Sequence, residues 1–96
     1  MANLDTILAG MSLPQKVALL AGRGFWYSTP VPEAGVPGMK LSDGPNAARG
    51  DMTSGATAAC FPVGVAMAAT WDESLIEAVG VALGEESHSK DIHVLL

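Results

Sequence analysis

The first periodic run of apolar residues lies close to the start of the chain. Leu13, Val17 and Leu20 recur at the spacing that places side chains on one face of a helix. They overlap the sequence Ser12-Leu13-Pro14-Gln15, which has the form of a capping box with proline in the first turn. Gly22 then supplies a C-terminal stop signal. The pattern predicts a short helix between Ser12 and Gly22.

The pattern changes in the following part of the chain. Arg23 to Gly38 mixes aromatic and aliphatic residues with several prolines, so we expect an extended, irregular segment pressed against a surface. Met39 to Ser42 then predicts a short strand. The strand ends at Asp43-Gly44-Pro45-Asn46, because glycine and proline do not continue a strand ladder.

The second half of the chain shows the clearest periodicity. Apolar residues between Leu75 and Leu83 keep the 3.6-residue spacing of a helix, while glutamates occupy the other face. Thr70-Trp71-Asp72-Glu73 precedes them as a second capping box. We therefore expect a helix from about Trp71 to Lys90. Ile92 to Leu96 is an almost continuous apolar run, which is typical of a strand buried on both faces.

The order of these elements predicts a fold class. A strand, a long loop, a helix and a second strand form one βαβ unit, here with a helix and an irregular segment before it. A parallel strand that is apolar on both faces needs neighbouring strands and covering helices. We therefore expect the beginning of a larger α/β domain, incomplete as it stands.

Composition and charge exclude several classes of protein. The chain has 96 residues, of which 49% are hydrophobic and 16% charged, so it is not a disordered tail. Its net charge of -5, with Lys plus Arg totalling 5, argues against binding to nucleic acid. Cys60 is the one cysteine, which excludes an intrachain disulfide and a cysteine-based zinc site. No signal-peptide pattern or long apolar stretch is present, so a cytoplasmic protein without membrane binding is expected.

Several stretches of the chain together match the pattern of a known family. They are Ser12–Gly22, Gly24–Trp26, Gly35–Asn46, Arg49–Gly50, Ala59–Pro62, Ala68–Asp72, Gly84–Glu86 and Ile92–Leu96. In this order they resemble the opening of glycoside hydrolase family 3 β-glucosidases, and Ser42 to Asn46 is their most specific part. The resemblance implies that residues 1–96 are the N-terminal portion of the family's catalytic domain. The implied fold is α/β: the first βα units of a (β/α)8 TIM-type barrel, after an N-terminal helix.

The resemblance also implies a substrate-binding role for Asp43 and Arg49. The family aspartate at the position of Asp43 accepts hydrogen bonds from sugar hydroxyls in the −1 subsite, where a carboxylate offers two strong acceptor oxygens. Arg49 would touch this subsite or, as the preferred reading, orient the loop by pairing with Asp43 or Asp51. From the residues alone, however, Asp-Gly after a strand is equally an ordinary turn.

Other residues with chemical potential are better explained by structure. We expect Phe25 and Trp26 to anchor the irregular segment and Trp71 to pack. Glu85-Glu86-Ser87-His88 has a Glu-x-x-His spacing, but without the further ligands of a di-iron site it is interpreted as a solvated helix face. His93 is expected to be a hydrogen-bonded core histidine and Cys60 a small buried hydrophobic residue. No metal and no cofactor are predicted.

The catalytic groups are expected outside this chain. A retaining glycosidase needs two carboxyl groups about 5–5.5 Å apart, and the family carries both on later parts of the barrel. One hypothesis is therefore that the chain is part of a retaining β-glucosidase that hydrolyses terminal non-reducing β-D-glucosyl residues of a β-glucoside or oligosaccharide. The alternative is a non-catalytic fragment or interaction module that docks on a partner supplying the rest of the barrel. Under both hypotheses the isolated chain is inactive.

Overall fold

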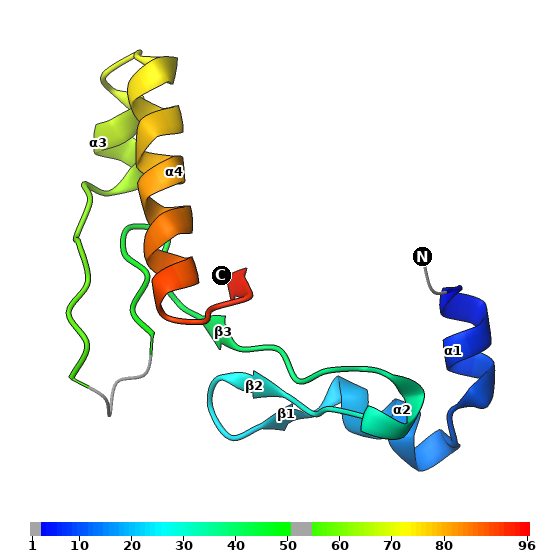
Figure 1. The fold of residues 1–96 in the computed structure, drawn as a ribbon. Helices are drawn as coiled ribbons and strands as arrows, with labels where there is room; N and C mark the ends of the chain where they lie inside the picture. The colour runs from blue at the N-terminus through cyan, green and yellow to red at the C-terminus, as the bar shows by residue number, and fades with distance from the viewer. Residues whose placement is uncertain (1–2, 51–54) are drawn as a thin grey trace. The chain divides into compact units, whose positions relative to one another are not determined.

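The computed structural model of the chain describes residues 3–50 and 55–96 (Figure 1). These residues form two compact units, Met1–Lys40 and Leu41–Leu96.

Two short helices begin the first unit. Helix α1 spans Leu4–Gly10, and the Asn3 side chain caps it by accepting a hydrogen bond of 2.9 Å from the backbone N–H of Asp5. Helix α2 spans Leu13–Leu20 and confirms the predicted helix together with its capping box. The Ser12 N–H donates to Gln15 Oε1 at 2.8 Å, and the Gln15 N–H donates back to Ser12 Oγ at 3.4 Å. Helix α1 was not predicted, because it is too short to show an apolar period.

The segment predicted to be irregular contains a small hairpin. Strand β1, Gly22–Arg23, pairs antiparallel with β2, Tyr27–Ser28. A turn of 3-10 helix, η1, follows at Pro32–Ala34. Gly22 therefore belongs to a strand rather than to the helix stop, and helix α2 ends on Ala21 instead. Strands of two residues carry no alternating pattern, so the sequence could not reveal them.

The second unit is built on a parallel strand pair. Strand β3, Leu41–Ser42, pairs with β4, Val94–Leu95, and the backbone N–H of Leu96 donates to the Ser42 carbonyl at 2.9 Å. Helices α3, Gly64–Ala68, and α4, Glu73–Ser89, lie between them in sequence and side by side in Figure 1. The predicted order of strand, helix and parallel strand is confirmed, although both strands are shorter than expected. Helix α3 was missed, because five residues without a side-chain cap leave no local signal.

The ends of α4 differ in detail from the prediction. Asp72 caps the helix by accepting the N–H of Leu75 at 3.0 Å. Thr70 is not the cap; its hydroxyl donates to the Met67 carbonyl at 2.7 Å and closes the preceding turn. At the other end, Asp91 has a left-handed conformation (φ 54°), and the Ile92 N–H bonds back into the last helical turn. No helix of the described residues has the length and apolar character that a membrane span requires.

Large apolar side chains remain exposed in both units. Met11 and Val31 are buried in the first unit, and Ala48, Leu83 and Ile92 in the second. In contrast, Phe25 is 95% exposed and Trp71 is 94% exposed, so the predicted anchoring of Phe25 and packing of Trp71 are not found among the described residues. Only Trp26 of the predicted anchors is half-buried. The described chain has a small core for so apolar a composition.

Candidate functional site

A pocket opens at the carboxyl end of strand β3. Its volume is about 260 Å³. It is lined by the loop after β3 and by a single residue, Cys60, of the segment that precedes α3. The lining residues are Asp43, Gly44, Pro45, Asn46, Ala47, Arg49 and Cys60. The structure thus brings both predicted substrate-binding residues, Asp43 and Arg49, to one pocket.

Hydrogen bonds from Ser42 close the loop after β3. The Ser42 side chain is fully buried, and its hydroxyl donates to the Asp43 carbonyl and accepts the Gly50 N–H, both at 2.9 Å. The Arg49 N–H adds a bond of 3.3 Å to the same carbonyl. A short polar side chain that bonds nearby backbone is a common way to hold such a loop. Sequence reasoning had treated Ser42 only as the end of a strand.

Gly44 is required by the shape of this loop. Its φ is +140°, and a Cβ atom at this position would lie 1.5 Å from the carbonyl oxygen of Ala47. No side chain fits at that distance, so only glycine lets the chain turn here. The turn directs the chain away from the carboxyl end of β3 and leaves the Asp43 side chain at the pocket.

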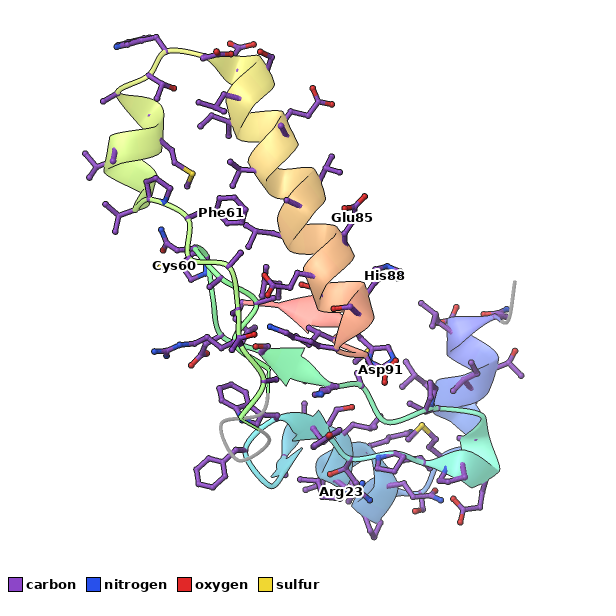
Figure 2. All side chains as sticks on the ribbon, turned by 60° about the vertical axis from the view of Figure 1, so that its left-hand side comes forward. Arg23, Cys60, Phe61, Glu85, His88 and Asp91 are labelled. Carbon is purple, nitrogen blue, oxygen red and sulfur yellow. The ribbon has the colours of Figure 1, made fainter. Side chains whose placement is uncertain are left out.

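Asn46 joins the loop to the segment before α3. Its side-chain amide donates to the Pro62 carbonyl at 2.6 Å, and its backbone carbonyl accepts the Phe61 N–H at 2.8 Å. These bonds bring Cys60 to the pocket, and Figure 2 shows Cys60 and Phe61 on this segment. Cys60 is exposed, so the prediction of a buried residue is wrong. The exposure of Cys60 depends on the bonds between Asn46 and residues 61 and 62, which are distant in sequence. The apolar residues next to Cys60 do not reveal these bonds.

The Asp43 carboxylate takes no part in holding the turn. The side chain is exposed, and among the described residues no hydrogen bond or ion pair involves it. An aspartate that serves a turn usually accepts a backbone N–H nearby with its carboxylate. In this loop the Ser42 hydroxyl accepts the N–H of Gly50, Gly44 makes the turn, and the Asn46 amide donates to the Pro62 carbonyl. Both carboxylate oxygens of Asp43 are therefore available to a ligand.

Arg49 is also exposed, and it does not pair with Asp43. Within residues 3–50 and 55–96 the structure shows no ion pair between these two side chains, although both line the pocket. The predicted loop-orienting pair with Asp43 is therefore wrong. The alternative pair with Asp51 lies outside the described residues. The two backbones are linked instead, so the separation of Asp43 and Arg49 is set by the loop itself.

An ion pair on α4 contacts the segments on both sides of the pocket. The Lys90 ammonium lies 2.9 Å from Glu86 Oε1 and donates to the Ala48 carbonyl at 2.6 Å. The same Glu86 oxygen accepts the Ala59 N–H at 3.1 Å. The hydrogen bond from Lys90 is the largest cause that lowers the pKa of Glu86. Burial opposes it, and the Ala59 N–H and the charge of Lys90 lower the pKa further.

The prediction of a solvated face at residues 85–88 is therefore only half right. Glu85 and His88 are exposed and project from α4 on the side away from Cys60 (Figure 2). Glu86 is part-buried and paired. The sequence signal for this pair was the Glu-to-Lys spacing of four residues, which favours contact on a helix. His93, expected in the core, is exposed. No group of three or more potential metal ligands gathers within the part of the chain that the structure describes.

Comparison with known proteins gives a consistent result. No protein-family model matches the chain. A β-glucosidase of Rhizobium radiobacter is 48% identical over 95 residues, or 97% of this chain. β-Glucosidase B of Emericella nidulans is 47% identical over 96 residues, or 99% of this chain. The chain spans 12% and 11% of the lengths of these two relatives.

Solved structures agree with the sequence relatives. The crystal structure of a β-glucosidase from Kluyveromyces marxianus in complex with glucose matches all of this chain (100%) with a TM-score of 0.93 and 32% identity, over 12% of its own length. A selenomethionine-labelled structure from the same organism matches with a TM-score of 0.92. The resemblance to β-glucosidases is confirmed. In sequence and in fold this chain is related to the β-glucosidases along nearly its whole length, consistent with an N-terminal segment of a glycoside hydrolase.

Proposed function

We propose that the chain is the N-terminal part of a family 3 β-glucosidase and that Asp43 binds the sugar in its −1 subsite. The observation that carries this proposal is the position of the Asp43 carboxylate. It stands at the carboxyl end of β3, in a pocket, with neither oxygen used by the loop among the described residues. Two adjacent sugar hydroxyls would each donate to one oxygen, and such charge-assisted bonds are about twice as strong as neutral ones.

A (β/α)8 barrel accounts for the unusual exposure of α4. The unit of β3, α4 and β4 has the parallel strands and crossover helix from which such barrels are built. In a barrel the helices pack on the strands and on each other. Leu75 and Val81 of α4 are 47% and 57% exposed, as expected of a helix whose barrel neighbours lie outside this chain. We infer that further βα units cover them.

The proposed reaction is hydrolysis of terminal non-reducing β-D-glucosyl residues with retention. It requires a nucleophile and an acid/base group about 5–5.5 Å apart, which we assign to parts of the barrel outside residues 1–96. Asp43 and Arg49 would bind and orient the sugar. The mechanism uses no cofactor and no metal. The substrate class is a β-glucoside or a β-linked oligosaccharide.

The test is a chimera in which this chain replaces the matching segment of the Rhizobium radiobacter β-glucosidase. We expect the chimera to hydrolyse an aryl β-glucoside. Asp43→Asn removes the charge and offers one acceptor where there were two, so kcat/KM should fall about ten- to a few-hundred-fold. Asp5→Asn makes the same chemical change on an exposed side chain of α1 and should leave kcat/KM unchanged.

Deoxy substrates separate a sugar contact from a general defect. If Asp43 binds a particular hydroxyl, Asp43→Asn should cost less on the 4-deoxy or 6-deoxy β-glucoside that lacks this hydroxyl, because the interaction is already absent. Equal losses on every substrate, or a lower melting temperature with unchanged kinetics, would show that Asp43 is a turn residue.

The exposed apolar residues also favour a second candidate function. A separate chain with these properties could act as a non-catalytic module that docks on a partner supplying the rest of the barrel. Complementation distinguishes the two cases. We expect the isolated chain to show no turnover of an aryl β-glucoside, and mixing it with a Rhizobium radiobacter enzyme that lacks the matching segment restores activity only if docking between separate chains suffices.

A further inference from the structure

We propose that Glu86 and Lys90 are positioning residues that act as a clamp. They hold the two walls of the sugar pocket, the loop after β3 and the segment before α3, in fixed positions relative to each other. The inference rests on the proposed function, because it concerns the same pocket. Neither residue lines that pocket. They act on it through the backbone of Ala48 and Ala59.

Each backbone contact falls next to a residue of the pocket. Lys90 binds the carbonyl of Ala48 at 2.6 Å, and Ala48 directly precedes Arg49 in the loop that begins at Asp43. Glu86 binds the N–H of Ala59 at 3.1 Å, and Ala59 directly precedes Cys60 on the opposing segment. The ion pair of 2.9 Å joins the two contacts. One ion pair at the C-terminal end of α4 therefore contacts both walls of the pocket.

The pair is too well shielded to be an ordinary surface ion pair. The side chains of Lys90 and Glu86 are 12% and 18% exposed, and Ala48 is fully buried. Exposed pairs of this spacing contribute little, because water screens them. Hydrogen bonds from a charged group to backbone are stronger. Within the described residues, Glu86 Oε2 is buried and has no hydrogen-bond partner, so loss of Lys90 would leave a poorly compensated carboxylate.

The contacts also connect distant parts of the chain. The bonds from Lys90 and Glu86 span 42 and 27 residues, whereas a pair that serves only its helix has no need of such partners. Asn46 links the same two segments directly to each other, whereas Glu86 and Lys90 connect both of them to a third element, α4. Helix α4 is the longest element of the described chain, so it supplies the fixed reference for both walls.

Substitutions in the Rhizobium radiobacter chimera test the proposal. Lys90→Met removes the donor to Ala48 and should raise KM for an aryl β-glucoside more than it lowers kcat, with about a tenfold loss in kcat/KM. Lys90→Arg keeps a charged donor and should recover part of the loss. Glu85→Gln, on the neighbouring exposed side chain, is the matched control and should be silent.

A charge swap distinguishes a clamp from a helix-stabilising pair. Glu86→Lys combined with Lys90→Glu restores an ion pair on α4, but it places a donor beside the Ala59 N–H and an acceptor beside the Ala48 carbonyl. The clamp therefore predicts that the swap stays impaired. Recovery of kcat/KM to the unmodified level by the swap would overturn the proposal.

Hydrogen exchange separates this inference from the proposed function. In the Lys90→Met chimera, amide exchange followed by mass spectrometry should accelerate in peptides covering residues 43–50 and 55–62 more than in peptides covering α1 and α2. Unchanged exchange there would overturn the clamp. Faster exchange would support the clamp even if Asp43→Asn were kinetically silent, and that silence would count against the sugar-binding role alone.

Discussion

At the scale of single residues, the loop after β3 separates structural from chemical roles. Ser42 closes the loop, Gly44 turns it and Asn46 fastens it to the segment before α3. Asp43 does none of these, although its sequence context is that of a turn. The functional role proposed for Asp43 therefore rests on its neighbours. They hold the loop without any hydrogen bond to the Asp43 carboxylate among the described residues.

Gly44 gives a prediction at this scale. Gly44→Ala places a methyl group against the Ala47 carbonyl in a backbone conformation that L-residues rarely adopt, so the loop cannot keep its shape. Strain of this kind costs on the order of 1–3 kcal/mol, and we expect loss of activity in the chimera together with faster amide exchange across residues 43–50. Gly80→Ala is the control: apart from its chain neighbours and the backbone of its own helix, no atom of the described chain lies within 4 Å of the new methyl, and the change should stabilise α4 by about 0.5–1 kcal/mol. A fully active Gly44→Ala chimera would contradict the requirement for glycine at the turn after β3.

At the scale of elements, α4 shows how local chemistry fixes a helix. Its apolar period and its cap are contained within a few neighbouring residues, so the sequence located it within a few residues at each end. Its contacts are a different matter. Glu86 and Lys90 reach backbone groups 27 and 42 residues away, and no local pattern contains that information.

The cap of α4 predicts a pH dependence. The hydrogen bond from the Ser74 hydroxyl, followed by that from the Leu75 N–H, lowers the pKa of Asp72 below its ordinary value of 3.8. A carboxyl with a lowered folded pKa stabilises the helix fully above its unfolded pKa, and this contribution is lost as pH falls through the folded pKa.

The measurement is the helical circular dichroism of the chain between pH 7 and pH 2. Helix content should fall in the acid range, below the ordinary aspartate pKa of 3.8. Asp72→Asn keeps a capping oxygen and should remove this part of the pH dependence, whereas Asp72→Ala should lower helix content already at pH 7. Identical titrations for the original chain and Asp72→Asn would show that the cap is not responsible.

At the scale of the whole molecule, exposed apolar surface is the dominant feature. Phe25 and Trp71 are almost fully exposed, and β3 and β4 form a sheet of two strands. Unpaired strand edges and apolar patches favour association with other chains. We therefore predict that the isolated 96-residue chain is partly unfolded or oligomeric.

Analytical sedimentation with a thermal melt checks this prediction. Oligomers, or a monomer without a cooperative transition, are the expected result. A compact monomer that melts cooperatively would show that residues 1–96 form a sufficient core alone, and the inferred cover from further barrel units would then be unnecessary. Adding the Rhizobium radiobacter enzyme that lacks the matching segment should reduce self-association if that enzyme covers the same surface.

The sequence by itself determined the features that depend on residues close together in the chain. The capping box of α2 and the period of α4 follow from spacing within a few residues. The order of strand, helix and parallel strand follows from the general rule for βαβ connections. The stretch from Ser42 to Asn46 also carried the relationship to β-glucosidases, which the comparisons confirm. The physical reason is that caps and helix faces are formed by residues that are close in the chain.

Only the tertiary structure decided where distant segments meet. It placed Cys60 in the pocket, left Asp43 without a structural partner among the described residues and joined Glu86 and Lys90 to the pocket walls. It also showed the hairpin of β1 and β2, whose pairing depends on bonds between two very short strands. These contacts depend on the paths of whole loops through space, and a path of that kind is set by the summed packing of the fold rather than by any short run of residues.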